Sequence, residues 1–168
     1  MAAPHRRRLL GWAGAAAALL PLAGCGFALR RAPELPFRRI ALVGFSAQTA
    51  VAEELRRAMP AGVSVVADPR DAEVVLEALV DRRSRSVAAM TAAGQVRELT
   101  LHSRLQYRLA TRGGRLLLPP VEVAFSRDLS YSEAAALAKA DEERLLWRAM
   151  EAEIAMQVLR RLAATPAL

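Results

Sequence analysis

The chain has 168 residues with a formal net charge of +7, and 54% of the residues are hydrophobic. This length is typical of one domain whose core is stable without disulfides, and a single cysteine excludes an intramolecular disulfide. Residues 1–24 hold three of the 24 basic residues and none of the 17 acidic ones, so residues 25–168 carry a net charge of +4. Such a small excess argues against a nucleic-acid-binding protein and is compatible with a surface that meets anionic lipid or saccharide.

The first 24 residues have the parts of a lipoprotein signal peptide. Arg6–Arg8 form a basic segment, and the apolar stretch 9–20 behind it is too short to span a bilayer core, which needs roughly 20 residues. Residues 22–25 read Leu-Ala-Gly-Cys, which resembles the bacterial lipobox. We therefore expect cleavage after residue 24 and a Cys25 that carries S-diacylglycerol and N-palmitoyl groups, an anchor much firmer than one acyl chain. The alternative is a lone buried cysteine behind an ordinary signal peptide.

Two segments follow the predicted cleavage site. Residues 25–37 are expected to form a short lipidated tether, because Pro33 and Pro36 oppose regular structure. Residues 38–168 are expected to form one folded domain.

The domain begins with a strand, a helix and a second strand. The β-rich run 38–45 predicts the first strand, and Gly44 closes it. Apolar residues recur every four positions over 48–59, which predicts a helix that Pro60 ends. A short strand is expected at 63–66, followed by a loop at Asp68-Pro69.

Three further segments predict the rest of the sheet. Residues 72–81 alternate between apolar and acidic side chains, whereas 82–94 are polar and small and indicate a loop or a ragged strand end. Strict alternation over 99–109 predicts an antiparallel strand with one wet face, and Gly113-Gly114 predicts the hairpin turn that leads to a strand at 121–126. The expected buried face of 99–109 consists of Leu99, Leu101, Leu105, Tyr107 and Leu109.

A long helix is expected to close the chain, from the capping-box spacing of Ser130 and Glu133 to about residue 163. Its predicted apolar stripe contains Leu145, Ala149, Ala152, Met156 and Leu159, joined by Trp147, Met150, Ile154 and Val158. The order of elements predicts an α+β fold, a two-layer sandwich of two helices packed on a mixed, mainly antiparallel sheet of about four strands.

No residue pattern indicates catalysis. His102 is the only histidine after residue 24, and it falls on the polar face of a strand, so neither a metal site nor a cysteine–histidine pair is expected. Phosphate-binding glycine loops and nucleophile elbows are absent from the sequence. We interpret the chain as a binding or assembly protein that is not an enzyme and needs no cofactor.

Several stretches, in order along the chain, resemble the LptE family of lipopolysaccharide-assembly lipoproteins. They are residues 24–30 (GCGFALR), 94–99 (GQVREL) and 125–131 (FSRDLSY), continued by 136–143 (ALAKADEE) and 157–162 (QVLRRL). The resemblance implies an outer-membrane lipoprotein that plugs the β-barrel LptD, assists its assembly and helps to insert lipopolysaccharide into the outer leaflet. Gly26 fits this location, since the aspartate that retains lipoproteins in the inner membrane is missing.

The resemblance also implies site residues and partners. Lys139 matches a basic position of the family suited to lipopolysaccharide contact, and Arg97 and Arg85 are the candidates for a second contact, because 91–93 lack the family's basic residue. The wet strand face is expected to meet the polar barrel lumen through His102, Arg104, Gln106 and Arg108. The alternative function is an outer-membrane lipoprotein that binds and activates a periplasmic enzyme of envelope synthesis.

Overall fold

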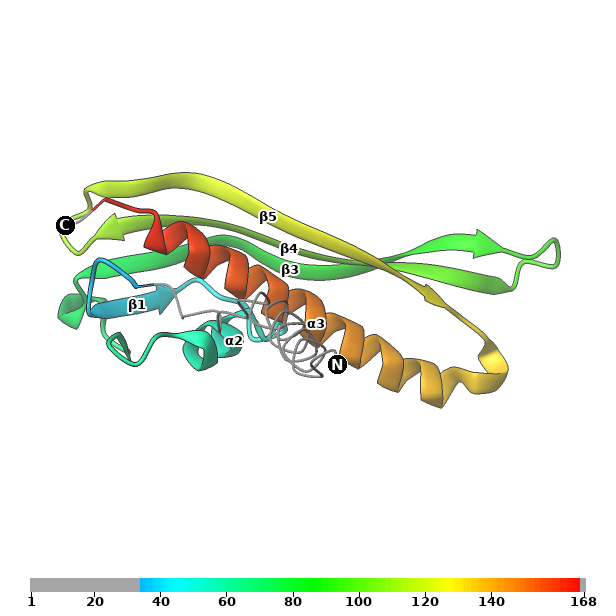
Figure 1. The fold of residues 1–168 in the computed structure, drawn as a ribbon. Helices are drawn as coiled ribbons and strands as arrows, with labels where there is room; N and C mark the ends of the chain where they lie inside the picture. The colour runs from blue at the N-terminus through cyan, green and yellow to red at the C-terminus, as the bar shows by residue number, and fades with distance from the viewer. Residues whose placement is uncertain (1–33, 167–168) are drawn as a thin grey trace, which may run out of the picture. The chain divides into compact units, whose positions relative to one another are not determined.

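The computed structural model describes residues 34–166, so the predicted signal peptide and Cys25 lie outside the described residues. Five strands and two α-helices make up the domain (Figure 1). In chain order they are β1 (Arg39–Val43), α2 (Val51–Ala58), β2 (Ser64–Val66), β3 (Val74–Met90), β4 (Val96–Thr111), β5 (Leu116–Ser130) and α3 (Ala136–Ala163). Two single-turn 3-10 helices, Pro69–Asp71 and Glu133–Ala135, precede β3 and α3.

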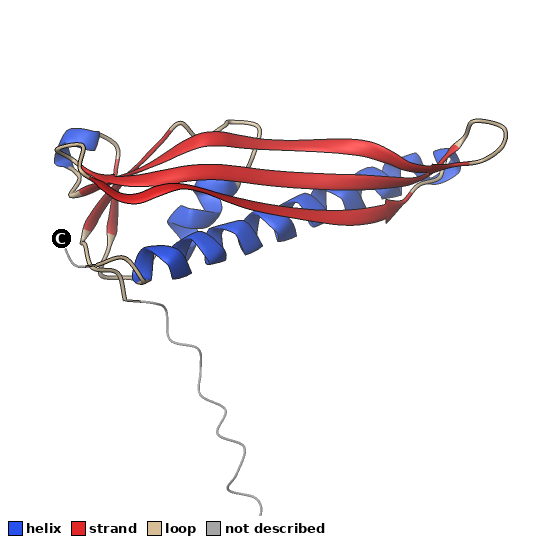
Figure 2. Ribbon diagram, turned by 90° about the horizontal axis from the view of Figure 1, so that it is seen from above, coloured by secondary structure: helices blue, strands red, loops and turns tan. Residues whose placement is uncertain are grey.

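The strands form one mixed sheet in the order β2-β1-β3-β4-β5. β1 pairs in parallel with β2 and β3, while β3, β4 and β5 form an antiparallel meander. Both helices lie on the same side of the sheet, and α3 runs beneath the long strands (Figures 1 and 2). The predicted two-layer α+β sandwich is confirmed, with five strands instead of about four; the three-residue β2 adds the fifth at an edge.

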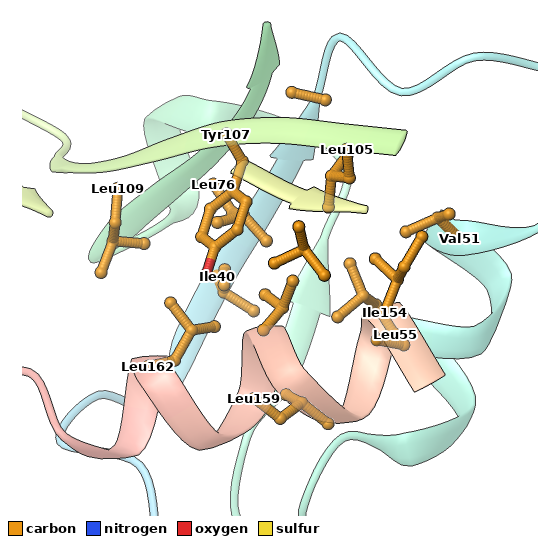
Figure 3. Close-up of a cluster of buried hydrophobic side chains, with 14 of the residues drawn as sticks. Ile40, Val51, Leu55, Leu76, Leu105, Tyr107, Leu109, Ile154, Leu159 and Leu162 are labelled. Atoms are coloured by element: carbon orange, nitrogen blue, oxygen red, sulfur yellow. The ribbon is translucent and has the colours of Figure 1, made fainter. Parts of the chain in front are cut away.

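The core lies between the helices and one face of the sheet. The alternate residues Leu105, Tyr107 and Leu109 of β4 are fully buried against apolar side chains of α3 and β1 (Figure 3). Leu99 and Leu101 continue the same face, and neither is more than 8% exposed. Period-two alternation therefore predicted the buried face of β4 correctly, because each such side chain points toward the helices.

Residues 82–94 were predicted to form a loop or a ragged strand end, and the loop is wrong for residues 82–90. β3 runs without interruption to Met90, and only residues 91–95 form the turn into β4. In this half of β3 nearly every residue is exposed, so no hydrophobic alternation marks it as a strand. Pairing with β4, from Arg82 opposite Arg104 to Val87 opposite Leu99, holds it in place.

The edge strand and the long helix also differ from expectation. β5 begins at Leu116 and includes Pro119-Pro120, which an edge strand tolerates at an irregularity in pairing. Ser130 belongs to β5, so the predicted capping box does not form. The buried stripe of α3 contains five of the nine predicted residues, Trp147, Met150, Ile154, Val158 and Leu159, whereas Leu145 of the prediction is 61% exposed. The whole stripe consists of Trp147, Met150, Glu151, Ile154, Ala155, Val158, Leu159 and Leu162. Within the described residues no helix is long and apolar enough to cross a membrane.

Candidate functional site

The face of the sheet opposite the helices is polar along the three long strands. The predicted residues His102, Arg104, Gln106 and Arg108 all lie on it, because they alternate along β4 with the buried residues. Residues directly opposite each other on antiparallel strands share a face, so β3 and β5 contribute their own polar rows here. We call this surface the helix-free face; its further members include Glu77, Arg82, Ser84, Ser86, Glu122, Ser126 and Asp128.

Most charges on the helix-free face are paired within the face. Arg108 Nη2 lies 2.7 Å from Glu77 Oε2, and Arg104 Nη2 lies 2.5 Å from Glu122 Oε2. His102 Nε2 lies 3.1 Å from the hydroxyl oxygen of Ser86. Exposed pairs of this kind contribute at most about 1 kcal/mol to stability. They keep the surface polar and close to neutral, which is suited to contact with a second polar surface.

A hollow of about 350 Å³ opens in the middle of this face. The residues that line it come from all three long strands: Arg82, Ser84, His102, Ser103, Arg104, Ala124, Phe125 and Ser126. Arg82 and Ser84 were missed by the sequence analysis because they fall in the segment predicted to be a loop or a ragged strand end. Between Ala78 and Val80 the pairing of β3 with β4 shifts register, and this irregularity turns Arg82 and Ser84 toward the hollow.

The predicted lipopolysaccharide-contacting residues lie toward the β3–β4 turn. Lys139 Nζ donates to Ser130 Oγ (2.9 Å) and pairs with Glu142 Oε2 (2.8 Å). Arg97 lies at the start of β4, where its carbonyl oxygen accepts a hydrogen bond from the Tyr131 amide (2.8 Å). The structure thus brings Lys139 and Arg97 to the same end of the sheet, beside the end of β5.

Arg85 differs from the other two predicted contacts. It lies on the helix side of β3, opposite Leu101, and its guanidinium pairs with Glu143 of α3 at 3.4 Å. Among the described residues, Arg97 is the one predicted contact without an ion-pair partner. Of the three predicted contacts, Arg97 is therefore the one whose positive charge no described carboxylate neutralises.

The tip of the β3–β4 hairpin is uncharged, a feature that was not identified from the sequence. Residues 86–96 contain no charged side chain, and Val87 and Met90 are 51% and 58% exposed. The hairpin extends past the start of α3 (Figures 1 and 2). Arginines at 85 and 97 flank this apolar tip on its two strands.

The buried carboxylate of Glu151 and the half-buried carboxylate of Asp81 form a separate cluster at the start of α2. Asp81 Oδ2 accepts hydrogen bonds from the Ser46 amide (2.9 Å) and the Thr49 hydroxyl (2.7 Å). Glu151, which is 1% exposed, accepts from the Ala50 amide (3.2 Å) and so places a negative charge at the start of α2. One oxygen of each carboxylate has no hydrogen-bond partner. Glu151 could have been noticed in the sequence, because it is an acidic residue among the apolar residues of the buried stripe of α3.

Burial raises the pKa of Glu151 above its ordinary value, and the negative charges of Asp81 and Glu54 add to this rise. The Ala50 hydrogen bond and the positive charge of Arg83 oppose it. The folded state therefore binds a proton at this site more readily than the unfolded state does. Stability from this group is greatest at acidic pH and falls as the pH rises from about 4.5 through the folded-state pKa.

We expect Glu151→Gln to flatten this pH dependence, since glutamine cannot titrate. Urea unfolding between pH 5 and pH 8 tests the expectation through the difference between the two proteins, in which the contributions of other carboxyl groups cancel. The wild-type midpoint falls relative to the variant's as the pH rises. Parallel curves would show that the two states of wild type share one pKa at this site.

The described residues include no group of three histidine, cysteine, aspartate or glutamate side chains placed to hold a metal ion. The chemistry that the helix-free face offers is recognition, through guanidinium, imidazole, hydroxyl and carboxylate groups on a rigid sheet.

Comparisons with known proteins agree with this picture. A family model described as "LptE: Lipopolysaccharide-assembly" matches residues 37–162. The chain is similar to the solved structure of a lipoprotein B from Nitrosomonas europaea, described as uncharacterized, at 29% identity over 83% of this chain and 91% of that chain, with a TM-score of 0.68. Rare lipoprotein B from Shewanella oneidensis is 25% identical over 76% and 95% of the two chains, with a TM-score of 0.60.

A minor lipoprotein from Acinetobacter baumannii shares the fold, with a TM-score of 0.63 at 22% identity over 80% of this chain and 98% of that chain. Comparison with curated protein sequences gives no match.

Proposed function

Since the chain belongs to the LptE family of lipopolysaccharide-assembly proteins, we propose that it plugs an LptD-like β-barrel of the outer membrane, assists the barrel's assembly and helps to insert lipopolysaccharide into the outer leaflet. The family acts in lipopolysaccharide assembly and is not enzymatic. The activation of a periplasmic enzyme is not favoured by this membership. In the proposal, residues 1–24 are the cleaved signal peptide, Cys25 is the anchor, and residues 25–37 tether the domain to the membrane.

The observation that carries the barrel contact is the helix-free face. α2 and α3 cover one side of the sheet, and among the described residues no element covers the other side. Large barrels have polar interiors, so a plug needs a polar surface whose charges are balanced. The pairs Arg108–Glu77 and Arg104–Glu122 provide that balance, and the long strands hold them on a stiff surface.

The hairpin end supports the proposed contact with lipopolysaccharide. Lipid A combines phosphate groups with acyl chains, and this end combines cationic side chains with an apolar tip. Arg97 is the best-placed cation, because Lys139 and Arg85 pair with Glu142 and Glu143. In the proposal, phosphates compete with these glutamates for Lys139 and Arg85, and Val87 and Met90 contact the acyl chains.

We expect Arg108→Glu to reduce the amount of barrel that co-purifies with the affinity-tagged lipoprotein from outer membranes by about tenfold. The change replaces an attraction with repulsion from Glu77 and puts two neighbouring negative charges on the proposed contact surface. Loss of about 1.4 kcal/mol of binding free energy corresponds to a factor of ten. Quantitative immunoblotting of the barrel measures the ratio.

Arg144→Glu is the matched control. Arg144 forms an exposed pair with Asp141, as Arg108 does with Glu77, but both residues lie on α3, away from the helix-free face. Both variants change the charge equally and both should keep a near-native unfolding temperature, since exposed pairs contribute little. Equal yields of barrel from the two variants, or no barrel with the wild-type protein, would contradict the proposal.

A further inference from the structure

The hollow on the helix-free face contains an unusual cross-strand pair. Arg82 of β3 lies directly opposite Arg104 of β4. Like charges at such positions repel each other. Glu122 compensates Arg104, but in the described part of the chain Arg82 has no acidic partner. An excess of positive charge therefore stays at the hollow, on a face whose other arginines are paired.

Arg104 also has a hydrogen-bond donor without an acceptor. Its Nε is enclosed and has no acceptor among the described residues, although Nη2 contacts Glu122. Buried donors without acceptors are rare in folded proteins and call for an explanation. An anion between Arg82 and Arg104 would attract both guanidinium groups and let Arg104 reorient toward an acceptor.

The size of the hollow points to more than a simple anion. Large side chains from β3 and β4 stand beside the small residues Ser84, Ala124 and Ser126, and this difference in size opens the space. A volume of about 350 Å³ falls in the lower part of the range for small-molecule sites. A single carboxylate or phosphate group would leave most of this volume to water.

The groups around the hollow match a sugar that carries a phosphate. Guanidinium groups bind phosphate oxygens bidentately. The Ser84 and Ser126 hydroxyls donate and accept hydrogen bonds, as sugar hydroxyls require, and the ring of His102 lies in the same row between them. These groups come from three paired strands, so little backbone rearrangement is needed for binding.

We propose that this hollow binds a phosphorylated saccharide, with the phosphate between Arg82 and Arg104 and the sugar over Ser84 and Ser126. The inference rests on the proposed function for the source of the ligand, because lipopolysaccharide contains phosphorylated sugars. The site lies within the helix-free face, so in the assembled plug the ligand would lie between this face and the barrel wall. It is distinct from the hairpin end, where Lys139 and Arg97 lie.

Titration of the lipidated protein in detergent micelles with glucosamine 1-phosphate tests the inference. His102 is the only histidine after residue 24, so its ring resonances report on the hollow without ambiguity. We expect a saturable shift of these resonances, at least a fivefold loss of affinity in Arg82→Gln, and unchanged affinity in Arg148→Gln, an exposed arginine of α3. Ala124→Leu should also abolish binding, because it fills the hollow without changing the charge.

Other outcomes would overturn the inference. A shift that does not saturate, or an equal loss in the Arg82 and Arg148 variants, would show that no site exists. Equal affinity for inorganic phosphate would show that the hollow binds anions without recognising the sugar, and would contradict the proposal. Tighter binding of a glutamate-rich peptide would assign the hollow to a protein partner. Co-purification of the barrel is measured separately, so failure of the saccharide site and failure of the plug function can be told apart.

Discussion

Gly44→Ala is expected to lower the free energy of unfolding by about 2–5 kcal/mol, the sum of a backbone strain and a steric clash. Gly44 directly follows β1 and has a φ of +76°, a conformation that residues with a Cβ rarely adopt. An added Cβ would also overlap the backbone carbonyl oxygen of Ala78, which cannot rotate away as a side chain would. The strand pairing of β1 with β3, or the loop toward α2, must therefore shift.

Gly94→Ala is the matched control for the strain alone. Gly94 has a φ of +79° in the β3–β4 turn, but an added Cβ there meets no atom within 4 Å. Its expected cost is about 1–2 kcal/mol, the left-handed strain without the clash. Urea unfolding of the two variants measures the difference. Equal losses would mean that β3 moves freely away from Gly44 and that the clash contributes nothing.

The sequence predicts this fold well where burial is one-sided. Leu101, Leu105 and Tyr107 alternate with polar residues, and one face of β4 is buried as predicted. The second half of β3 could not be found in this way, since both of its faces are largely exposed and its residues follow no period. Its extended conformation depends on pairing with β4, and the local sequence propensity of β3 does not reveal that pairing.

The candidate site shows the same division. Alternation along β4 was enough to place His102 and Arg104 on one polar face, but it could not show that Arg82 lies beside them. The register irregularity between Ala78 and Val80 decides which side of the sheet Arg82 occupies, and one residue of slip reverses every side chain beyond it. Glu151 was likewise not identified from the sequence, because its burial depends on Ala50 at the start of α2, which lies 101 residues earlier in the chain.

The largest expected effect on function comes from Cys25→Ala. If Cys25 carries the lipids, the variant is neither modified nor cleaved in the manner of a lipoprotein, and it should incorporate no palmitate. Burial of acyl chains contributes about 0.8 kcal/mol per methylene, so three chains hold a protein on a membrane far more strongly than its polar surface can. Labelling with palmitate and mass spectrometry of the purified protein measure the modification directly.

Ala32→Ser is the control, because it alters the proposed tether and leaves the Leu-Ala-Gly-Cys sequence intact. Its palmitate incorporation should equal that of wild type. A wild-type protein that begins elsewhere than Cys25 and keeps a free thiol would contradict the assignment and favour an ordinary exported cysteine. Membrane fractionation should be done in cells depleted of the barrel, because contact between the helix-free face and the barrel is proposed to keep the domain at the membrane even without the lipid anchor. Under those conditions the variant should be lost from the outer-membrane fraction, because it lacks both the lipid anchor and the barrel.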